Sequence, residues 1–162
     1  MSQTIERILE TCIYPTRNGA QGLEVLMMQP QGGANKGLWV PPGGKIMFDE
    51  SPRECAIREM EKTGLYPSTI LFRGMVTEIS PFEHKQWLLF LYVSTSHQGE
   101  TFSNIGEGKF QWYPLIDLPM LPKPQSDAIF GPAVLDLSSD FFEATMLFDA
   151  SLKLVETRVV GK

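Results

Sequence analysis

A chain of 162 residues, with 43% hydrophobic and 20% charged residues, has the composition of an ordinary globular protein, and its length suits one domain spanning residues 1–162. The formal net charge of -5 excludes the basic surface that binds nucleic acid as a polymer, so a polyphosphate ligand would need divalent cations to approach it. The two cysteines, Cys12 and Cys55, have neither a zinc-type nor a CxxC spacing. Neither a leader nor a membrane-spanning segment is recognisable, so we expect a cytoplasmic protein that does not contact membranes.

The first forty residues predict three strands. Residues 4–14 are rich in β-branched and aromatic side chains and precede a proline and an Asn-Gly turn pair, and residues 23–29 form a second apolar run. Residues 30–37 contain three glycines and a proline, which predicts a loop. Residues 38–40 are then expected to form a short strand.

Residues 41–65, PPGGKIMFDESPRECAIREMEKTGL, predict a turn at a glycine pair followed by a helix. Ser51 is a plausible N-cap and Pro52 suits the first helical position, while Gly64 marks the end. Several Glu and Arg side chains therefore gather beside a glycine-rich backbone. That arrangement is typical of metal-assisted chemistry on a phosphate chain.

The remaining elements follow from the same signals. Residues 69–79 and 86–96 predict strands on either side of a turn at 80–85, and residues 109–113 predict another short strand. Residues 126–137 have helical apolar spacing, with a bend or a shortened helix expected at Gly131-Pro132. Residues 141–148 and 152–160 predict a terminal hairpin. Strands before, between and after two main helices predict an α+β fold, with a mixed sheet between helices in an α/β/α sandwich.

Four residues in the glycine and helix segment have a characteristic spacing. Five residues separate Gly44 from Glu50, and seven separate Glu50 from Arg58, which is followed by Glu59. This spacing resembles the Nudix box of the Nudix hydrolases. The flanking stretches LWVPPGGK and EGKFQWYPL and the terminal hairpin resemble the MutT and 8-oxo-dGTP diphosphatase branch of that family.

The resemblance implies a Nudix fold and hydrolysis of a nucleoside diphosphate linked to a further group, with Mg²⁺ or Mn²⁺ as cofactor. Cations held by carboxylates cancel phosphate charge and lower the pKa of bound water, and Mg²⁺ needs few protein ligands. By resemblance, Gly43 supplies a backbone carbonyl to the metal and Glu59 is a metal ligand. Glu50 pairs with Arg58, and Lys45 lies near the phosphates.

The end of the box departs from the family pattern, because the chain from Met60 to Leu65 is one residue short. A helix turns about 100° per residue, so the neighbours of Glu59 on its own face are Lys62 and Thr63 rather than carboxylates. In one alignment Glu61 becomes the first glutamate of the usual pair and Lys62 replaces the second, with a tightened last turn absorbing the missing residue.

A second alignment stays open. Glu54, Arg58 and Glu61 share one helix face and would form a shifted cluster. Both alignments leave fewer metal ligands than the family pattern, so we expect weaker metal binding and slower or absent turnover. The alternative to an active enzyme is a weak or inactive Nudix protein that binds a nucleotide or a protein partner. Glutamates and arginines at such spacings also occur as ordinary ion pairs on a solvated helix face.

Candidates for binding the base are aromatic, although each would also suit core packing. They are Trp39, Phe82, Trp87 and Trp112. Asp127 lies where the resembled branch places an aspartate that reads the purine edge, and a role at a helix N-terminus is the alternative. The asparagine that this branch has after the tryptophan is Val40 here, which argues against specificity for oxidised purines.

Two further residues have open roles. Glu107 precedes a predicted strand where Nudix enzymes often carry an extra carboxylate that serves as metal ligand or base, and a solvated loop residue is the alternative. His84, in a turn, is either a phosphate contact or an exposed turn residue. The expected partner is a small nucleotide substrate. A homodimer is compatible with the sequence.

Overall fold

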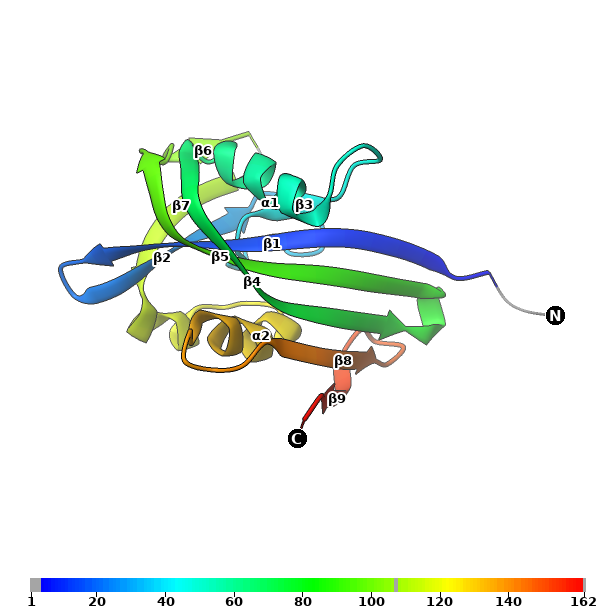
Figure 1. The fold of residues 1–162 in the computed structure, drawn as a ribbon. Helices are drawn as coiled ribbons and strands as arrows, with labels where there is room; N and C mark the ends of the chain where they lie inside the picture. The colour runs from blue at the N-terminus through cyan, green and yellow to red at the C-terminus, as the bar shows by residue number, and fades with distance from the viewer. Residues whose placement is uncertain (1–3, 107, 162) are drawn as a thin grey trace.

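The structure, a computed structural model, describes residues 4–106 and 108–161 (Figure 1). Nine strands form one mixed sheet in the order β6-β7-β2-β1-β5-β4-β8-β9, and β3 pairs with β1 beside this row. The strands are β1 Glu6–Gly19, β2 Gly22–Pro30, β3 Gly43–Lys45, β4 Leu65–Ser80, β5 Lys85–Gly99, β6 Asn104–Ile105, β7 Gly108–Pro114, β8 Phe142–Phe148 and β9 Leu154–Val159. The pairs β1–β5 and β4–β8 are parallel, and the other pairs are antiparallel.

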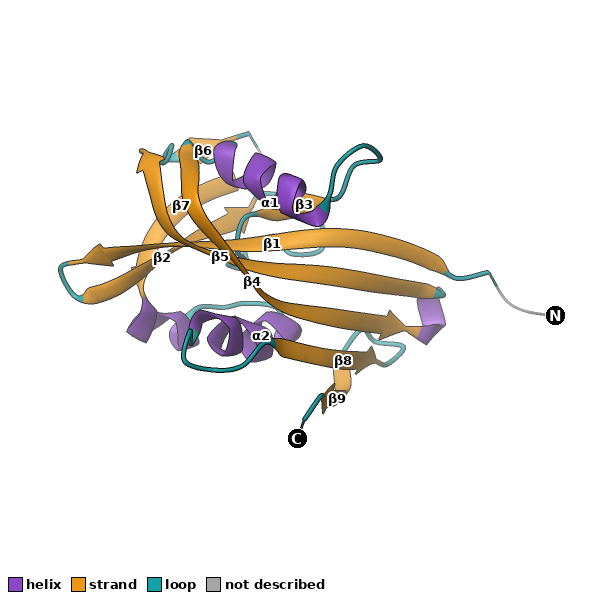
Figure 2. Cartoon of the chain, in the orientation of Figure 1, coloured by secondary structure: helices purple, strands orange, loops and turns teal. Residues whose placement is uncertain are grey.

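Two α-helices lie on opposite faces of this sheet (Figure 2). They are α1 Pro52–Glu61 and α2 Gln125–Leu135, and short 3₁₀ helices occupy η1 Pro81–Glu83 and η2 Leu115–Met120. The predicted α/β/α sandwich with a mixed sheet and two main helices is therefore confirmed. None of the helices in the described ranges is long and apolar enough to cross a membrane.

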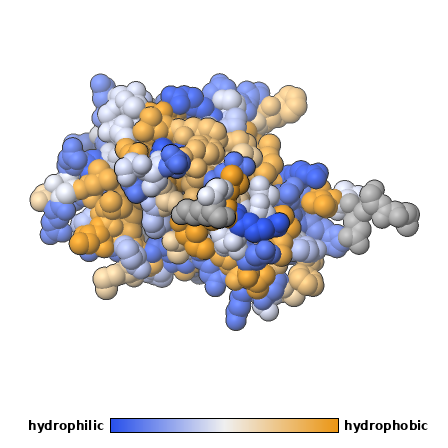
Figure 3. Space-filling view, turned by 60° about the horizontal axis from the view of Figure 1, so that its bottom comes forward, coloured by the Kyte–Doolittle hydropathy of each residue, from blue (hydrophilic) through white to orange (hydrophobic). Residues whose placement is uncertain are grey.

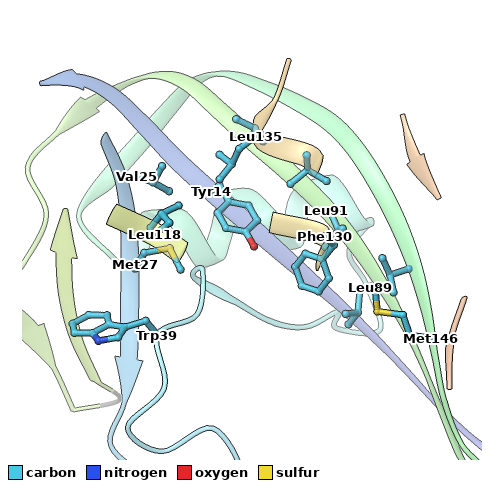
Figure 4. Packing of buried hydrophobic residues seen from close by; sticks show 13 residues of the cluster. Tyr14, Val25, Met27, Trp39, Leu89, Leu91, Leu118, Phe130, Leu135 and Met146 are labelled. Atoms are coloured by element: carbon cyan, nitrogen blue, oxygen red, sulfur yellow. The ribbon is translucent and has the colours of Figure 1, made fainter. Parts of the chain in front are cut away.

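Each face of the sheet has its own hydrophobic cluster, because successive side chains of a strand point to opposite faces. Tyr14 belongs to the cluster beneath α2, and its neighbour Ile13 belongs to the cluster beneath α1. Phe130 of α2 is fully buried in the first cluster (Figure 4), and Met60 of α1 is fully buried in the second. The outer surface on the α2 side carries broad apolar areas broken by hydrophilic residues (Figure 3).

Strand β1 extends beyond its predicted end at residue 14 and reaches Gly19. Pro15 has no amide hydrogen to donate to Ser94, its partner on the parallel strand β5. It is tolerated because the Thr16 hydroxyl donates to the Ser94 carbonyl instead, at 2.8 Å. The last residues of β1 then pair with β2 around a turn. The prediction of a strand at residues 38–40 is wrong, because this stretch makes only an isolated bridge, between Val40 and Met28 of β2.

The bend predicted at Gly131-Pro132 is not observed, although the helix is shorter than predicted. Helix α2 is continuous through both residues and ends at Leu135. Gly131 packs against the sheet, where an added Cβ would lie 3.1 Å from the Tyr14 hydroxyl oxygen. Burial of Phe130 and Val134 against the sheet outweighs the hydrogen bond that Pro132 cannot donate.

Candidate active site

The glycine pair of the predicted turn forms strand β3, so the turn prediction is wrong. Gly43 and Gly44 pair with Cys12 and Thr11 of β1. A side chain at Gly43 would overlap the Thr11 carbonyl oxygen, and an added Cβ at Gly44 would lie 2.6 Å from Oε1 of Glu59. The two glycines are therefore required for close approach of the backbone to β1 and to a carboxylate of α1.

Helix α1 begins with the predicted cap. The Ser51 hydroxyl accepts from the Glu54 amide at 3.1 Å, and the Glu54 carboxylate accepts from the Ser51 amide at 3.0 Å. These hydrogen bonds lower the pKa of Glu54. Glu54 serves this capping box, and in the part of the chain that the structure describes Arg58 pairs with Glu50 and Glu59 rather than with Glu54 or Glu61.

Glu50 and Arg58 form the predicted ion pair in a two-pronged geometry. The Arg58 Nε donates to Glu50 Oε2 at 3.0 Å and its Nη2 donates to Oε1 at 2.6 Å. Nη2 also donates to the Lys45 carbonyl at 3.2 Å, and the Met47 amide donates to Glu50 at 2.9 Å. The hydrogen bonds from Arg58 and Met47 lower the pKa of Glu50 to about 2. The loop between β3 and α1 is thereby tied to the helix.

Glu59 is held against the backbone of β3. Only 7% of the residue is exposed, and its Oε1 accepts from Arg58 Nη1 at 2.7 Å and from Lys62 Nζ at 3.2 Å. The other oxygen, Oε2, accepts no hydrogen bond from the residues that the structure describes. One carboxylate oxygen atom beside Gly44 of β3 is therefore left for a ligand.

The last turn of α1 is tightened, as the first alignment predicts. The Thr63 amide donates to the Met60 carbonyl and the Gly64 amide to the Glu61 carbonyl, both at 3.0 Å and three residues apart. The Glu61 side chain is exposed at this end. Within residues 4–106 and 108–161, no three His, Cys, Asp or Glu side chains are grouped to hold a metal ion. Glu107 lies outside the described residues, so its predicted role is untested.

These residues fit a metal ion with few protein ligands. Gly44 has no side chain, and this leaves the space that the Glu59 carboxylate occupies beside β3. Mg²⁺ is commonly held by one or two carboxylates, with phosphate oxygens and water supplying the other positions. Glu59 and the Gly43 carbonyl would hold such an ion, and Glu61 is exposed at the end of the same helix.

A cavity of about 880 Å³ extends across the sheet from β3. Lys45 of β3 and Glu10 of β1 line it, as do Trp87 of β5 and Glu78 of β4. These strands lie in the order β3-β1-β5-β4, so the cavity spans four neighbouring strands. Asp127, in the first turn of α2, also lines it. Lys45 and Asp127, both predicted to bind substrate, therefore face one cavity together with acidic residues that the sequence did not single out.

The carboxyl groups of this cavity keep their protons to unusually high pH. Burial, and then the nearby charge of Glu78, raises the pKa of Asp127 to about 8, while Ser126 and Lys123 oppose the shift. Burial also raises the pKa of Glu78 and of Glu10. At neutral pH Asp127 is therefore mainly protonated and offers a hydrogen-bond donor as well as an acceptor.

The four aromatic candidates for binding the base lie in different environments. Trp39 is 8% exposed and packs edge-to-face on Tyr113 with ring centroids 5.0 Å apart, so it lies in the core and is not among the residues that line the cavity. The Trp112 ring is stacked on the His97 ring, with ring centroids 5.7 Å apart. Phe82 is exposed on η1 and His84 follows it in a left-handed turn conformation. Trp87 is the tryptophan that lines the cavity.

The sequence carries one signal for Glu10 and Glu78, the cavity residues that sequence reasoning alone does not identify. Glu10 and Glu78 lie within strands, on a face of the sheet that also carries buried apolar residues such as Leu89 and Val76. A carboxylate on the buried face of a strand is unusual and points to a site. The signal can be used only when the register of the sheet shows which face is buried.

Comparisons with known proteins agree with this geometry. The sequence model of the NUDIX domain matches residues 7–134. A curated relative from Bacillus subtilis strain 168, described as the uncharacterized Nudix hydrolase YvcI, is 36% identical over 108 residues, which cover 64% of this chain and 66% of the relative. The chain thus covers slightly less than two thirds of that relative's length.

Solved structures share the fold. The crystal structure of the mutator MutT protein from Bacillus halodurans matches with a TM-score of 0.78 and 26% identity, over 98% of this chain and 99% of that chain. The NUDIX domain of Shewanella oneidensis NrtR, solved with ADP ribose, matches with a TM-score of 0.67 and 22% identity, over 78% of this chain and 84% of that one. At this lower identity the likeness shows the fold alone.

Proposed function

The chain belongs to the Nudix family, and we propose that it is a pyrophosphohydrolase that cleaves a diphosphate bond in a nucleotide, with Mg²⁺ or Mn²⁺ as cofactor. The substrate class is a nucleoside diphosphate linked to a further group, including an oxidised or non-standard nucleoside triphosphate. The similarity to YvcI and to the mutator MutT protein supports hydrolase chemistry on such a bond.

One observation carries this proposal: a continuous set of charge contacts joins Glu50, Arg58, Glu59 and Lys62 against the glycine backbone of β3. Arg58 positions both carboxylates. The ordered Glu59 carboxylate and the Gly43 carbonyl then form a preorganised place for a cation at the edge of the cavity. Because Arg58 and Lys62 fix the orientation of the Glu59 carboxylate, little reorganisation is needed when the substrate binds.

The residues have separate roles in the proposed reaction. Lys45 binds a phosphate oxygen, and Asp127 binds the base at the far side of the cavity. Glu59 holds the cation, which when bound neutralises phosphate charge and lowers the pKa of a bound water. We assign Glu61 or Glu107 as the further carboxylate that orients the attacking water.

A substrate panel tests the proposed activity. The protein is incubated with nucleoside triphosphates, oxidised nucleotides and nucleotide sugars in Mg²⁺ or Mn²⁺, and products are separated by ion-exchange chromatography. We expect a nucleoside monophosphate and a second phosphorylated product from at least one member. No product from any member would overturn the proposal.

The second candidate is a nucleotide-binding protein with little or no catalysis. It is favoured by the lack, in the described ranges, of a group of three carboxylates suited to a metal. Its sign is a melting temperature that rises with a nucleotide when no product forms. Sedimentation velocity on the same samples tests the predicted homodimer.

A further inference from the structure

Beyond the phosphate-binding end, the structure assigns Glu78 and Ser80, with Trp87 as a stacking surface, to a subsite that selects a heteroaromatic base carrying an exocyclic amino group. The inference rests on the proposed function, since it names the class of nucleotide. It concerns the wall of the cavity formed by β4 and β5, at the opposite side of the cavity from Lys45.

The sheet register places the three side chains together. Glu78 and Ser80 are two residues apart on β4, so both point to the same face. Trp87 of β5 lies directly opposite Glu78 in the antiparallel pair, and the Trp87 side chain packs against the α2-side cluster. All three residues line the same cavity.

Ser80 has a hydrogen-bonding group without a partner. The residue is 1% exposed, and its hydroxyl makes no hydrogen bond to the described residues. A buried hydroxyl of this kind destabilises the fold unless a ligand or water satisfies it. Because the residue lines the cavity, a polar group of the substrate is its available partner.

The carboxyl groups beside it also lack cations. No ion pair among the described residues includes Glu10, Glu78 or Asp127, although Lys45 and Lys123 line the same cavity. The Lys123 Nζ donates a hydrogen bond to the Leu118 carbonyl. Glu78, which Ser126 contacts by one hydrogen bond, therefore has acceptor capacity left for a donor from the ligand.

The required ligand group follows from these surroundings. An exocyclic amino group supplies two donors, which suit a carboxylate and a hydroxyl acceptor at once. A flat aromatic ring attached to it can stack on the Trp87 indole. A base that carries oxygen at the same position has no donor there: the Ser80 hydroxyl can donate to that oxygen, but the Glu78 carboxylate faces a second acceptor in a desolvated site.

Two nucleotide pairs isolate the amino group. Guanosine and inosine triphosphates differ only in the 2-amino group, and cytidine and uridine triphosphates exchange an amino group for an oxygen. Binding is measured by isothermal titration calorimetry with Ca²⁺ in place of Mg²⁺, so the readout does not depend on hydrolysis. We expect the amino member of at least one pair to bind about tenfold tighter or more, because sites built around a hydrogen bond reject analogues that lack it.

Variants then assign the preference to residues. Glu78→Gln and Ser80→Ala should each reduce the ratio of the two dissociation constants to less than about threefold. Glu143→Gln, on the exposed surface of β8, is the matched control and should keep the full ratio. Circular dichroism and the melting temperature show that each variant is folded.

The outcomes separate this inference from the proposed function. Equal affinity within both pairs for the wild-type protein, tighter binding of the oxygen-bearing members, or a ratio retained in both variants overturns the base-selecting subsite, even if the protein hydrolyses nucleotides. A preference for the amino members without any hydrolysis supports the subsite and contradicts the proposed enzyme. The wild-type ratio alone can overturn the inference if a variant does not fold.

Discussion

The candidate site has two ends that differ in how their charges are satisfied: the charge contacts of α1, which lie behind the glycines of β3, and the cavity wall at β4. At the α1 end, the Arg58 guanidinium binds both Glu50 and Glu59, and Lys62 adds a second cation to Glu59. At the β4 end, Glu78 has no ion-pair partner among the described residues, and neither has Asp127. The pKa values move in opposite directions: that of Glu50 falls to about 2, and that of Asp127 rises to about 8.

The difference indicates a division of labour. A carboxylate that cationic side chains hold in one orientation suits the binding of a cation, because it needs little reorganisation. Carboxyl groups that keep protons and, among the described residues, have no ion-pair partner suit recognition of a hydrogen-bonding ligand. We therefore associate the α1 end with the chemical step and the β4 end with the choice of substrate.

The largest expected effect is that of Glu59→Gln. The substitution keeps the shape of the side chain but removes its charge, so kcat for the best substrate should fall by at least about 100-fold. The melting temperature should change little. Steady-state kinetics beside the control Glu143→Gln measure the effect, and unchanged kcat would show that the cation is held elsewhere.

Removal of the positioning residue should cost somewhat less. Arg58→Ala leaves Glu50 and Glu59 without their shared cation, so kcat should fall by about 10- to 100-fold, as for other groups that orient metal ligands. The melting temperature should fall as well. Arg53→Ala, on the same helix but outside these contacts, is the control for both measurements.

Repair of the shortened box should increase activity. Inserting one glutamate after Glu61 together with Lys62→Glu restores the family spacing and adds a carboxylate near Glu59. The hydrolysis rate in Mg²⁺ should rise by roughly tenfold. A rate that is equal to or below that of the wild-type protein would mean that the tightened turn is not what limits turnover.

The smallest effect concerns stability and pH. The pKa of Asp127 is raised in the folded protein, so the unfolded chain loses this proton first and stability falls as the pH rises from about 4 to about 8. Glu78 and Glu10, which face the same cavity, act in the same direction, while Lys123 opposes them. Asp127→Asn should therefore gain stability relative to the wild-type protein over this window, by an amount that grows as the pH rises. Urea denaturation at several pH values tests this, and parallel curves for the two proteins would contradict it.

The local part of the site could be predicted from the sequence. The N-cap at Ser51 follows from local sequence signals and is observed, and the contact of Glu50 with Arg58, which the family resemblance implies, is observed as well. The tightened last turn likewise follows from local spacing. Such features need no knowledge of the rest of the fold.

The cavity wall formed by β4 and β5 could not be predicted in the same way. Glu78 and Trp87 meet through strand pairing, and Asp127 reaches them from a helix far along the chain. Trp39 was assigned to substrate because an aromatic side chain suits both a core and a base, and only the tertiary packing distinguishes the two. The glycine pair was assigned to a turn because close approach to β1 and Glu59 is not visible in the sequence.

The most direct test of this division of labour measures kcat and the dissociation constant of one nucleotide for Glu59→Gln and Glu78→Gln side by side. We predict that Glu59→Gln loses kcat and keeps its affinity, whereas Glu78→Gln loses affinity for the amino-bearing nucleotide and keeps most of kcat. The reverse pattern, with Glu78→Gln abolishing turnover and Glu59→Gln affecting affinity alone, would contradict the account.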